Sequence, residues 1–176
     1  TVMGSMFRGA TAFNADISGW DTGSVTELVN MFRGATAFNS DISAWDTSNA
    51  TAMDHMFDGA SAFNQNLAGW NISHLAVDGD LGNYGAEAML NGTALSTANY
   101  NALLVGWAGQ ATIPSGISLG VGAVTYSAGP PAAARSVLTD SPNNWDVGDG
   151  GLSQVPNAPP NVAGVGGNNK ITVTWD

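Results

Sequence analysis

The sequence predicts an α/β fold, a solenoid of short helices and short parallel strands that ends in a C-terminal cap. Three observations predict it. The phrase MFRGATAFN occurs at 6–14 and 31–39, a close copy, MFDGASAFN, occurs at 56–64, and the copies start 25 residues apart. Because every copy carries the same apolar positions, each unit must bury its apolar face against the next. After the third copy the pattern changes, as expected of a terminal unit that shields the last core face.

Apolar and aromatic residues recur in fixed columns of the repeat. We predict that equivalent rings contact each other inside one continuous core, with Phe32 touching both Phe7 and Phe57. Burying one such side chain is worth roughly 1.5–3 kcal/mol, so stacking can offset the cost of ordering short elements. The main columns are Met3/Leu28/Met53, Met6/Met31/Met56, Phe7/Phe32/Phe57, Phe13/Phe38/Phe63, Ile17/Ile42/Leu67 and Trp20/Trp45/Trp70.

Each repeat is expected to contain one short helix. Ser24 and Glu27 have the spacing of a capping box, and Leu28, Met31 and Phe32 follow at i, i+3 and i+4 spacing. The same stripe returns at 53–57. A helix of about two turns does not persist alone, so packing would have to hold it.

The ends of these elements are also predicted. Gly34 and Gly59 directly follow the apolar stripes and are expected to stop the helices in the left-handed conformation. The segments DISGW, DISAW and NLAGW at 16–20, 41–45 and 66–70 are expected to be extended and to pair in parallel with their copies.

These motifs resemble the BspA-type leucine-rich-repeat family of bacterial surface proteins, with its MFxGAxxFNxDISxWDTSxVTxM unit. The period falls in the leucine-rich-repeat range. We therefore divide the chain into three leucine-rich-type repeats at 1–76 and a degenerate repeat with a C-terminal cap at 77–151. The resemblance implies a leucine-rich-repeat-like solenoid. Since Val2, Met3 and Met6 already occupy repeat positions, we expect the sequence to be an excised part of a longer protein.

The cap region contains several recognisable elements. MLNGTALS at 89–96 is a degraded fourth copy, displaced by an eight-residue insertion. Ser96 is a helix cap before Tyr100, Leu103, Leu104 and Trp107, which share one helical face. Residues 117–126 have strand character, and a second helix begins in PPAAARSVL.

Residues 152–176, a linker followed by alternating apolar residues, resemble the first strands of an incomplete fibronectin type III-like domain. A complete domain needs on the order of 100 residues. Three fates stay open for this tail: it is disordered, it lies along its own solenoid, or it pairs with the edge of another chain.

Composition excludes several function classes. The net charge is −10, with 14 acidic and 4 basic residues. This balance disfavours nucleic acid and anionic lipid, both of which need Lys and Arg to neutralise phosphate. No apolar run reaches the roughly 18 residues that span a bilayer, so no membrane insertion is expected. There is no cysteine, which excludes disulfides and thiolate metal sites.

Aspartates are the best candidates for a metal site. Asp16 and Asp41 share one repeat column, and stacking would place these like charges about 5 Å apart. Either the carboxylates accept hydrogen bonds from the turn, or a Ca²⁺ ion bridges neighbouring coils. Asp78, Asp80 and Asn83 also have short oxygen-ligand spacing, although the closing glutamate of an EF-hand is missing.

Other polar columns favour structural roles. Arg33 and Asp58 would form an exposed ion pair on adjacent coils, and Asn14, Asn39 and Asn64 would bond turn backbone as a ladder. His55 and His74 replace Ser or Asn of the earlier copies, which favours a surface position. We find no paired carboxylates, nucleophile elbow or phosphate loop, so we expect no enzyme and no certain cofactor.

The sequence therefore favours an extracellular adhesion or protein-interaction module within a larger, secreted, multidomain protein of the bacterial cell surface. The expected partner is a protein or glycan ligand on a cell surface or matrix, or copies of the chain itself. The alternative is a structural spacer or filament subunit whose tail strand pairs with a neighbouring chain. The size of the particle in solution would separate the two.

Overall fold

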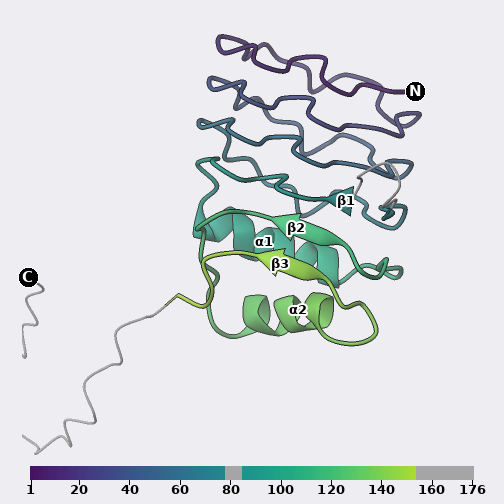
Figure 1. Ribbon diagram of the computed structural model, residues 1–176, viewed down its shortest axis with the longest axis vertical. Coiled ribbons are helices and arrows are strands. Elements are labelled where there is room, and N and C mark those ends of the chain that lie inside the picture. Colours follow the sequence, from purple (N-terminus) through teal and green to yellow (C-terminus); the bar gives the residue numbers. More distant parts are fainter. Residues whose placement is uncertain (78–84, 154–176) are drawn as a thin grey trace, which may run out of the picture.

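A computed structural model describes residues 1–77 and 85–153. The fold is mixed α/β. The chain first makes a series of stacked coils, and the helices lie toward the C-terminal end of the stack (Figure 1). The elements of this part of the chain are β1 (Gly85–Ala86), α1 (Thr97–Ala108), β2 (Ser118–Gly120), α2 (Pro130–Thr139) and β3 (Asp146–Gly148). The three strands form one parallel sheet in the order β1-β2-β3.

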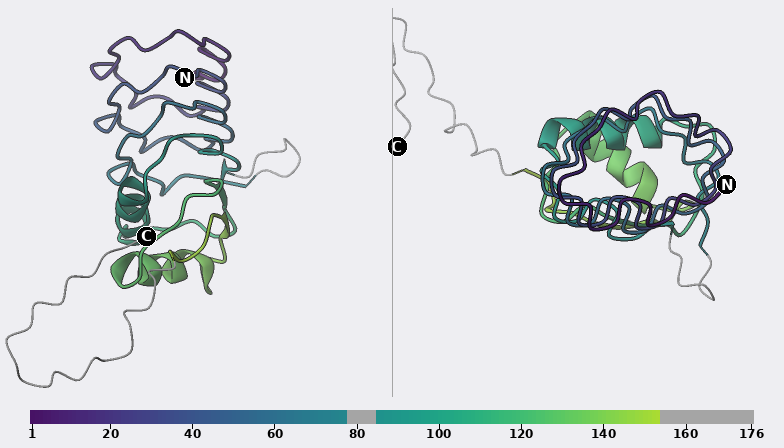
Figure 2. Two further views of the ribbon diagram at one scale, coloured as in Figure 1. Left: turned by 90° about the vertical axis from the view of Figure 1, so that its left-hand side faces the viewer. Right: turned by 90° about the horizontal axis from the view of Figure 1, so that it is seen from above.

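The repeats stack in register with the sequence period. Val2 forms a parallel bridge with Glu27, and Glu27 forms one with Ala52. Seen along the stack, the coils overlie one another (Figure 2). The one-period spacing predicted from the repeated phrase is therefore the spacing of the backbone pairing.

The predicted short helices at 28–32 and 53–57 are wrong. Asn30 and His55 have φ values of 58° and 53°, which a right-handed helix cannot include. Each coil instead makes consecutive turns. The N–H of Met31 donates to the carbonyl of Leu28 (3.1 Å), and that of Arg33 to Asn30 (3.2 Å). Consecutive turns bring i, i+3 and i+4 positions to one side, so the apolar spacing could not distinguish them from a helix.

The predicted capping box is also wrong, since no helix follows it. Glu27 takes part in the two parallel bridges, and the carbonyl of Ser24 accepts a hydrogen bond from the terminal amine of Thr1 (2.8 Å). The left-handed conformation expected at Gly34 and Gly59 is confirmed, with φ values of 70° and 75°. These glycines lie in turns rather than at helix ends.

The predicted parallel strands at 16–20, 41–45 and 66–70 are wrong as well. In these segments the chain turns, with the N–H of Trp45 donating to the carbonyl of Ile42 (3.1 Å). The link to the preceding coil comes from the side chain, because the Trp45 indole donates to the carbonyl of Ile17 (3.1 Å). The coils are therefore linked here by a hydrogen bond from the indole side chain, and not by the predicted hydrogen bonds between parallel strands.

The aromatic columns form the predicted continuous core. Phe32 is fully buried, and its ring centroid lies 5.5 Å from Phe7 and 5.6 Å from Phe57. The indoles of Trp20, Trp45 and Trp70 stack at 6.3 and 6.4 Å. The predicted contact between equivalent rings is confirmed.

The fourth copy joins the same stack eight residues late. The N–H groups of Met53 and Phe57 donate to the carbonyls of Gly85 and Met89 (2.8 and 2.9 Å), whereas Met3 donates to Glu27 (3.0 Å). The insertion inferred from the sequence is thus accommodated between 76 and 85, and the pairing resumes beyond it.

Both predicted C-terminal helices are confirmed. In α1 the Ser96 side chain accepts a hydrogen bond from the N–H of Asn99, and Tyr100, Leu103, Leu104 and Trp107 are buried. The helix α2 begins with two prolines. Proline has no backbone N–H, and the first turn of a helix does not use its N–H groups in intrahelical hydrogen bonds. Part of the expected strand character at 117–126 is present as β2.

Candidate functional site

Asp16 and Asp41 lie exposed on the outside of the coils. Each carboxylate accepts a hydrogen bond from the backbone N–H two residues later, Ser18 for Asp16 and Ser43 for Asp41, both at 2.9 Å. These bonds lower the pKa of both aspartates, because they favour the charged form. Two roles were predicted for these aspartates, hydrogen bonding within the turn and calcium binding. The structure shows the hydrogen bonding within the turn.

Among the residues that the structure describes, no third acidic ligand lies with Asp16 and Asp41. Among the described residues no three His, Cys, Asp or Glu side chains lie close enough to hold a metal ion. The other calcium candidates, Asp78, Asp80 and Asn83, lie outside the described residues. Calcium binding therefore stays a prediction.

The predicted pair between Arg33 and Asp58 is confirmed, with Nε 3.0 Å from Oδ2. The same oxygen lies 3.4 Å from Nδ1 of His55, which makes a three-residue polar cluster across two coils. His55 is partly buried here, whereas His74 is exposed and bonds Ser73 (3.1 Å). The surface position expected for the two histidines thus holds for His74 only.

The column of His55 has a backbone role that the sequence analysis missed. Ser5, Asn30, His55 and Ala88 occupy equivalent places and all have positive φ, at 61°, 58°, 53° and 49°. Asn is one of the few non-glycine residues that often adopt this conformation. Asn30 is therefore the sequence signal for this backbone conformation, although the variation between Ser, Asn and His in the column favours a surface position.

The predicted asparagine ladder is confirmed. Oδ1 of Asn14 accepts the backbone N–H of Asn39, and Oδ1 of Asn39 accepts that of Asn64, both at 2.8 Å. Asn64 extends the ladder by accepting the N–H of Ser96 (2.8 Å), which leads into α1. These amides therefore fix the spacing of successive coils.

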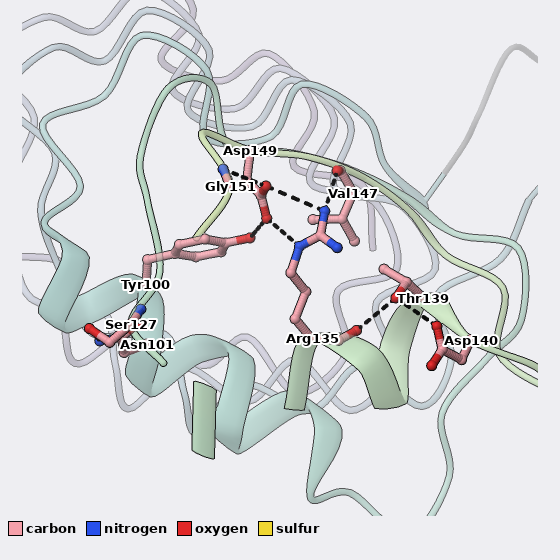
Figure 3. A network of polar contacts seen from close by, with 9 residues as sticks. All are labelled: Tyr100, Asn101, Ser127, Arg135, Thr139, Asp140, Val147, Asp149 and Gly151. Carbon is pink, nitrogen blue, oxygen red and sulfur yellow. Dashed lines mark hydrogen bonds and ion pairs between the residues drawn. The ribbon is translucent and has the colours of Figure 1, made fainter. Parts of the chain in front are cut away.

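A buried polar network joins the C-terminal elements (Figure 3). Nε of Arg135 on α2 lies 2.7 Å from Oδ2 of Asp149, whose side chain is only 2% exposed. The Tyr100 hydroxyl on α1 donates to the same oxygen (2.6 Å), and the Gly151 N–H donates to the other (3.0 Å). The Arg135 guanidinium also lies over the Tyr126 ring, 5.3 Å from its centroid.

This network is built for stability. Burial, together with the hydrogen bond to Asp149, raises the pKa of Tyr100, so the phenol stays protonated as a donor. The carboxylate is satisfied by three protein groups and lies inside the fold rather than in an open cleft. We assign it the role of tying α1 and α2 to the segment after β3.

A cavity of about 410 Å³ lies between the third coil and the end of α1. Gln110 crosses its edge, accepting the N–H of Ile72 (3.0 Å) and donating to the carbonyl of Trp70 (2.7 Å). Its lining side chains are amides, hydroxyls or small apolar groups, without an ionisable group. The lining therefore offers hydrogen-bond donors and acceptors.

No helix among the described residues combines the length and the apolar character needed to cross a bilayer. A family model described as "Mycoplasma protein of unknown function, DUF285" matches residues 1–89. No curated protein and no solved structure matches the chain.

Proposed function

We propose that this chain, which belongs to the DUF285 family of unknown function, is an extracellular adhesion or protein-interaction module. In this proposal it is a leucine-rich-repeat-like solenoid with a C-terminal cap, related to BspA-type surface proteins and part of a larger multidomain protein at the bacterial cell surface. Stacked coils with a fixed spacing support the solenoid, since only a repeated unit that buries the same residues can extend in this way.

One observation carries the binding role: the repeat keeps its core constant while an exposed column changes. Ser24, Asn49 and His74 occupy equivalent, exposed places on three neighbouring coils. The backbone beneath this column is fixed, because the Asn49 amide donates to the carbonyl of Gly23 (2.8 Å). Variation on a rigid scaffold suits recognition, since little ordering entropy is lost on binding.

The partner class follows from charge. With a net charge of −10, the surface suits neutral or basic protein surfaces and uncharged glycans better than polyanions. The exposed column contains hydroxyl, amide and imidazole groups, which are suited to hydrogen bonding with such ligands. We therefore propose a protein or glycan of a cell surface or matrix as the ligand, and no catalytic role.

The test is a binding assay with immobilised matrix glycoproteins and a glycan array. The unmodified chain should bind at least one of them, and the variant Ser24→Ala/His74→Ala, which keeps the Asn49–Gly23 bond, should lose that binding while unfolding at the same denaturant concentration. A matched variant, Ser18→Ala/Ser43→Ala, changes exposed side chains elsewhere on the coils and should bind normally. Equal binding by all three proteins would refute the assignment of the column.

A second candidate is a structural spacer or filament subunit. The observation that favours it is the apolar N-terminal end of the stack, where Val2 and Met6 are 62% and 50% exposed. Of the tail proposed to pair with a neighbouring chain, at 152–176, the structure describes only Leu152 and Ser153, and Leu152 forms a parallel bridge with Tyr126 of the same chain. Sedimentation at increasing concentration separates the candidates, because a filament subunit forms growing oligomers and a binding module stays monomeric.

A further inference from the structure

The cavity between the third coil and α1 lies where the repeat gives way to a helix. Within the repeats, each tryptophan indole bonds the preceding coil, as Trp70 does by donating to the carbonyl of Ile42 (3.1 Å). The third coil receives the equivalent bond from the helix, because the indole of Trp107 donates to the carbonyl of Leu67 (3.0 Å). Helix α1 therefore occupies the place of a further coil here, and the cavity lies beside that contact.

The walls of this cavity are fixed by contacts between the helix and the coil. A Cβ atom at Gly106 would overlap the carbonyl oxygen of Ala68, so only glycine lets α1 approach the coil this closely. Just beyond α1, the Gln110 side chain accepts the N–H of Ile72 (3.0 Å) and donates to the carbonyl of Trp70 (2.7 Å). The cavity is therefore formed before any ligand arrives, and little ordering is needed on binding.

The lining of the cavity is uncharged, although the protein is acidic. In the repeat column of Asn71 the earlier coils carry Asp21 and Asp46, so this acidic column becomes neutral at the coil that lines the cavity. A charged ligand would lose hydration here without gaining an opposite charge from the lining. The lining therefore favours a neutral ligand.

Two polar groups of the lining have no hydrogen-bond partner among the residues that the structure describes, namely Nδ2 of Asn71 and Oγ1 of Thr112. Oδ1 of Asn71 accepts the N–H of Ser73 (2.8 Å), so the side chain is held in place while its amide nitrogen is left to donate. The Thr112 hydroxyl both donates and accepts. These groups suit a ligand whose own groups donate and accept, as the hydroxyls of a sugar do.

A protein side chain suits this cavity less well. The residues that anchor protein interfaces are mainly Trp, Tyr and Arg, which fill well-packed, desolvated pockets. Glycine, alanine, amide and hydroxyl groups line this cavity, so it has neither a large apolar wall nor an opposite charge for such anchors. Its volume lies at the lower end of the range for small-molecule sites, about 300–1,000 Å³. The end of an oligosaccharide fits these properties better.

From these observations we propose that the cavity is a binding site for a neutral saccharide. The inference rests on the proposed binding role and specifies a glycan as its ligand. The cavity also adjoins the exposed column, because the hydroxyl of Ser73, a lining residue, bonds Nδ1 of His74 (3.1 Å). An oligosaccharide whose end lies in the cavity can therefore reach the column at His74.

The experiment titrates the isotope-labelled full chain with four neutral disaccharides, lactose, maltose, cellobiose and chitobiose, and with digalacturonic acid as a charged one. Nuclear magnetic resonance follows the side-chain amide signals of Asn71 and Gln110, which report on the cavity directly. We expect at least one neutral disaccharide to shift both signals with about millimolar affinity. Digalacturonic acid should bind roughly tenfold more weakly or not at all, because the lining offers its carboxylates no cation.

The variant Asn71→Asp/Thr112→Val removes the two unpaired groups of the cavity. The fold should tolerate the aspartate, because Asp46 occupies the same place in the second coil and accepts the equivalent turn N–H, that of Ser48 (2.9 Å). A carboxylate does not donate, and valine has no hydroxyl. We expect the variant to bind the neutral disaccharide roughly tenfold more weakly, with an unchanged denaturation midpoint.

The matched control, Asn66→Asp/Thr11→Val, makes the same two substitutions at residues outside the cavity lining. Both residues are exposed, and Asp41 occupies the place of Asn66 in the second coil. The control should bind the disaccharide as the unmodified chain does. Equal affinity of the two variants, or no shift of the Asn71 and Gln110 signals with any neutral disaccharide, would overturn the saccharide site.

Binding to native and enzymatically deglycosylated matrix glycoproteins separates this inference from the proposed function. We expect deglycosylation to abolish binding. Equal binding to both forms would identify a protein ligand, which would overturn the saccharide site and leave the interaction module standing. A chain that binds neither these glycoproteins nor any glycan would refute both proposals.

Discussion

The rings of Phe32 and Phe57 lie 5.6 Å apart and within 5° of parallel. Phe7 stacks on the opposite side of Phe32 at 5.5 Å, so Phe32 lies between the equivalent phenylalanines of the two neighbouring coils. Phe7 has such a neighbour on one side only and is partly exposed. The same residue type in the same local sequence therefore makes different contributions to stability, according to its place in the stack.

The first prediction compares these two rings. Phe32→Ala should lower the free energy of unfolding by about 3–5 kcal/mol, because it removes a fully buried ring and leaves a cavity between coils. Phe7→Ala should cost clearly less, since its ring is already partly in solvent. Guanidinium unfolding of both variants measures the difference. A Phe7→Ala cost equal to or above that of Phe32→Ala would contradict the account.

The period and the core of this fold were predictable because they depend on burial alone. Phe32 and Trp45 recur at fixed spacing whatever the backbone does between them, so their columns identify the core directly. The helix α1 was predictable for a similar reason: its cap Ser96 and its apolar face agree with each other. Local and long-range signals point to the same structure in both cases.

The conformation within each coil was not predictable from apolar spacing. A run of turns and a short helix both place Leu28, Met31 and Phe32 on one side, and the pattern favoured the commoner element. The feature that decides between them is the left-handed conformation of the residue before Met31. Asn30 is only a weak sign of this conformation, and the residues in the same column, Ser5 and His55, give no clearer sign. Of the site residues, the sequence left Asp16 and Asp41 two roles, turn hydrogen bonding or calcium binding, because carboxylate oxygens suit both.

The second prediction concerns Ala88, the fourth residue of the left-handed column. Its φ of 49° is costly for a residue with a Cβ atom and free of that cost for glycine. Ala88→Gly should therefore raise the free energy of unfolding by about 1 kcal/mol. Ala86→Gly, in β1 and fully buried, is the matched control and should destabilise. Thermal unfolding that ranks the two variants in the opposite order would refute the strain at Ala88.

The third prediction contrasts two Arg–Asp pairs. Arg135 faces an Asp149 side chain that is 2% exposed, whereas the partners in the Arg33–Asp58 pair are 39% and 26% exposed. Arg135→Met leaves a buried carboxylate without its cation and should cost about 3–5 kcal/mol. Arg33→Met should cost about 0–1 kcal/mol, because solvent screens that pair. Chemical denaturation measures both, and similar losses would contradict the assigned role of the buried network.

The fourth prediction is a pH dependence. Burial and the bond to Asp149 raise the pKa of Tyr100 in the folded state above the value of about 10 expected in the unfolded chain. The contribution of this group is therefore present in full below about pH 10 and declines as the pH rises further. Stability measured from pH 8 to 11 should fall less steeply above pH 10 for Tyr100→Phe than for the unmodified chain. Parallel curves would show that Tyr100 does not titrate with folding.

Register between coils is the central claim, and paired cysteines test it most directly because the chain has no cysteine of its own. Neighbouring coils place equivalent Cα atoms about 5 Å apart, within the range of a disulfide, whereas every second coil lies about 10 Å away. We predict that Ser24→Cys/Asn49→Cys forms an intramolecular disulfide under mild oxidation and that Ser24→Cys/His74→Cys does not. Efficient closure of the second pair, or failure of the first in a folded protein, would contradict the account.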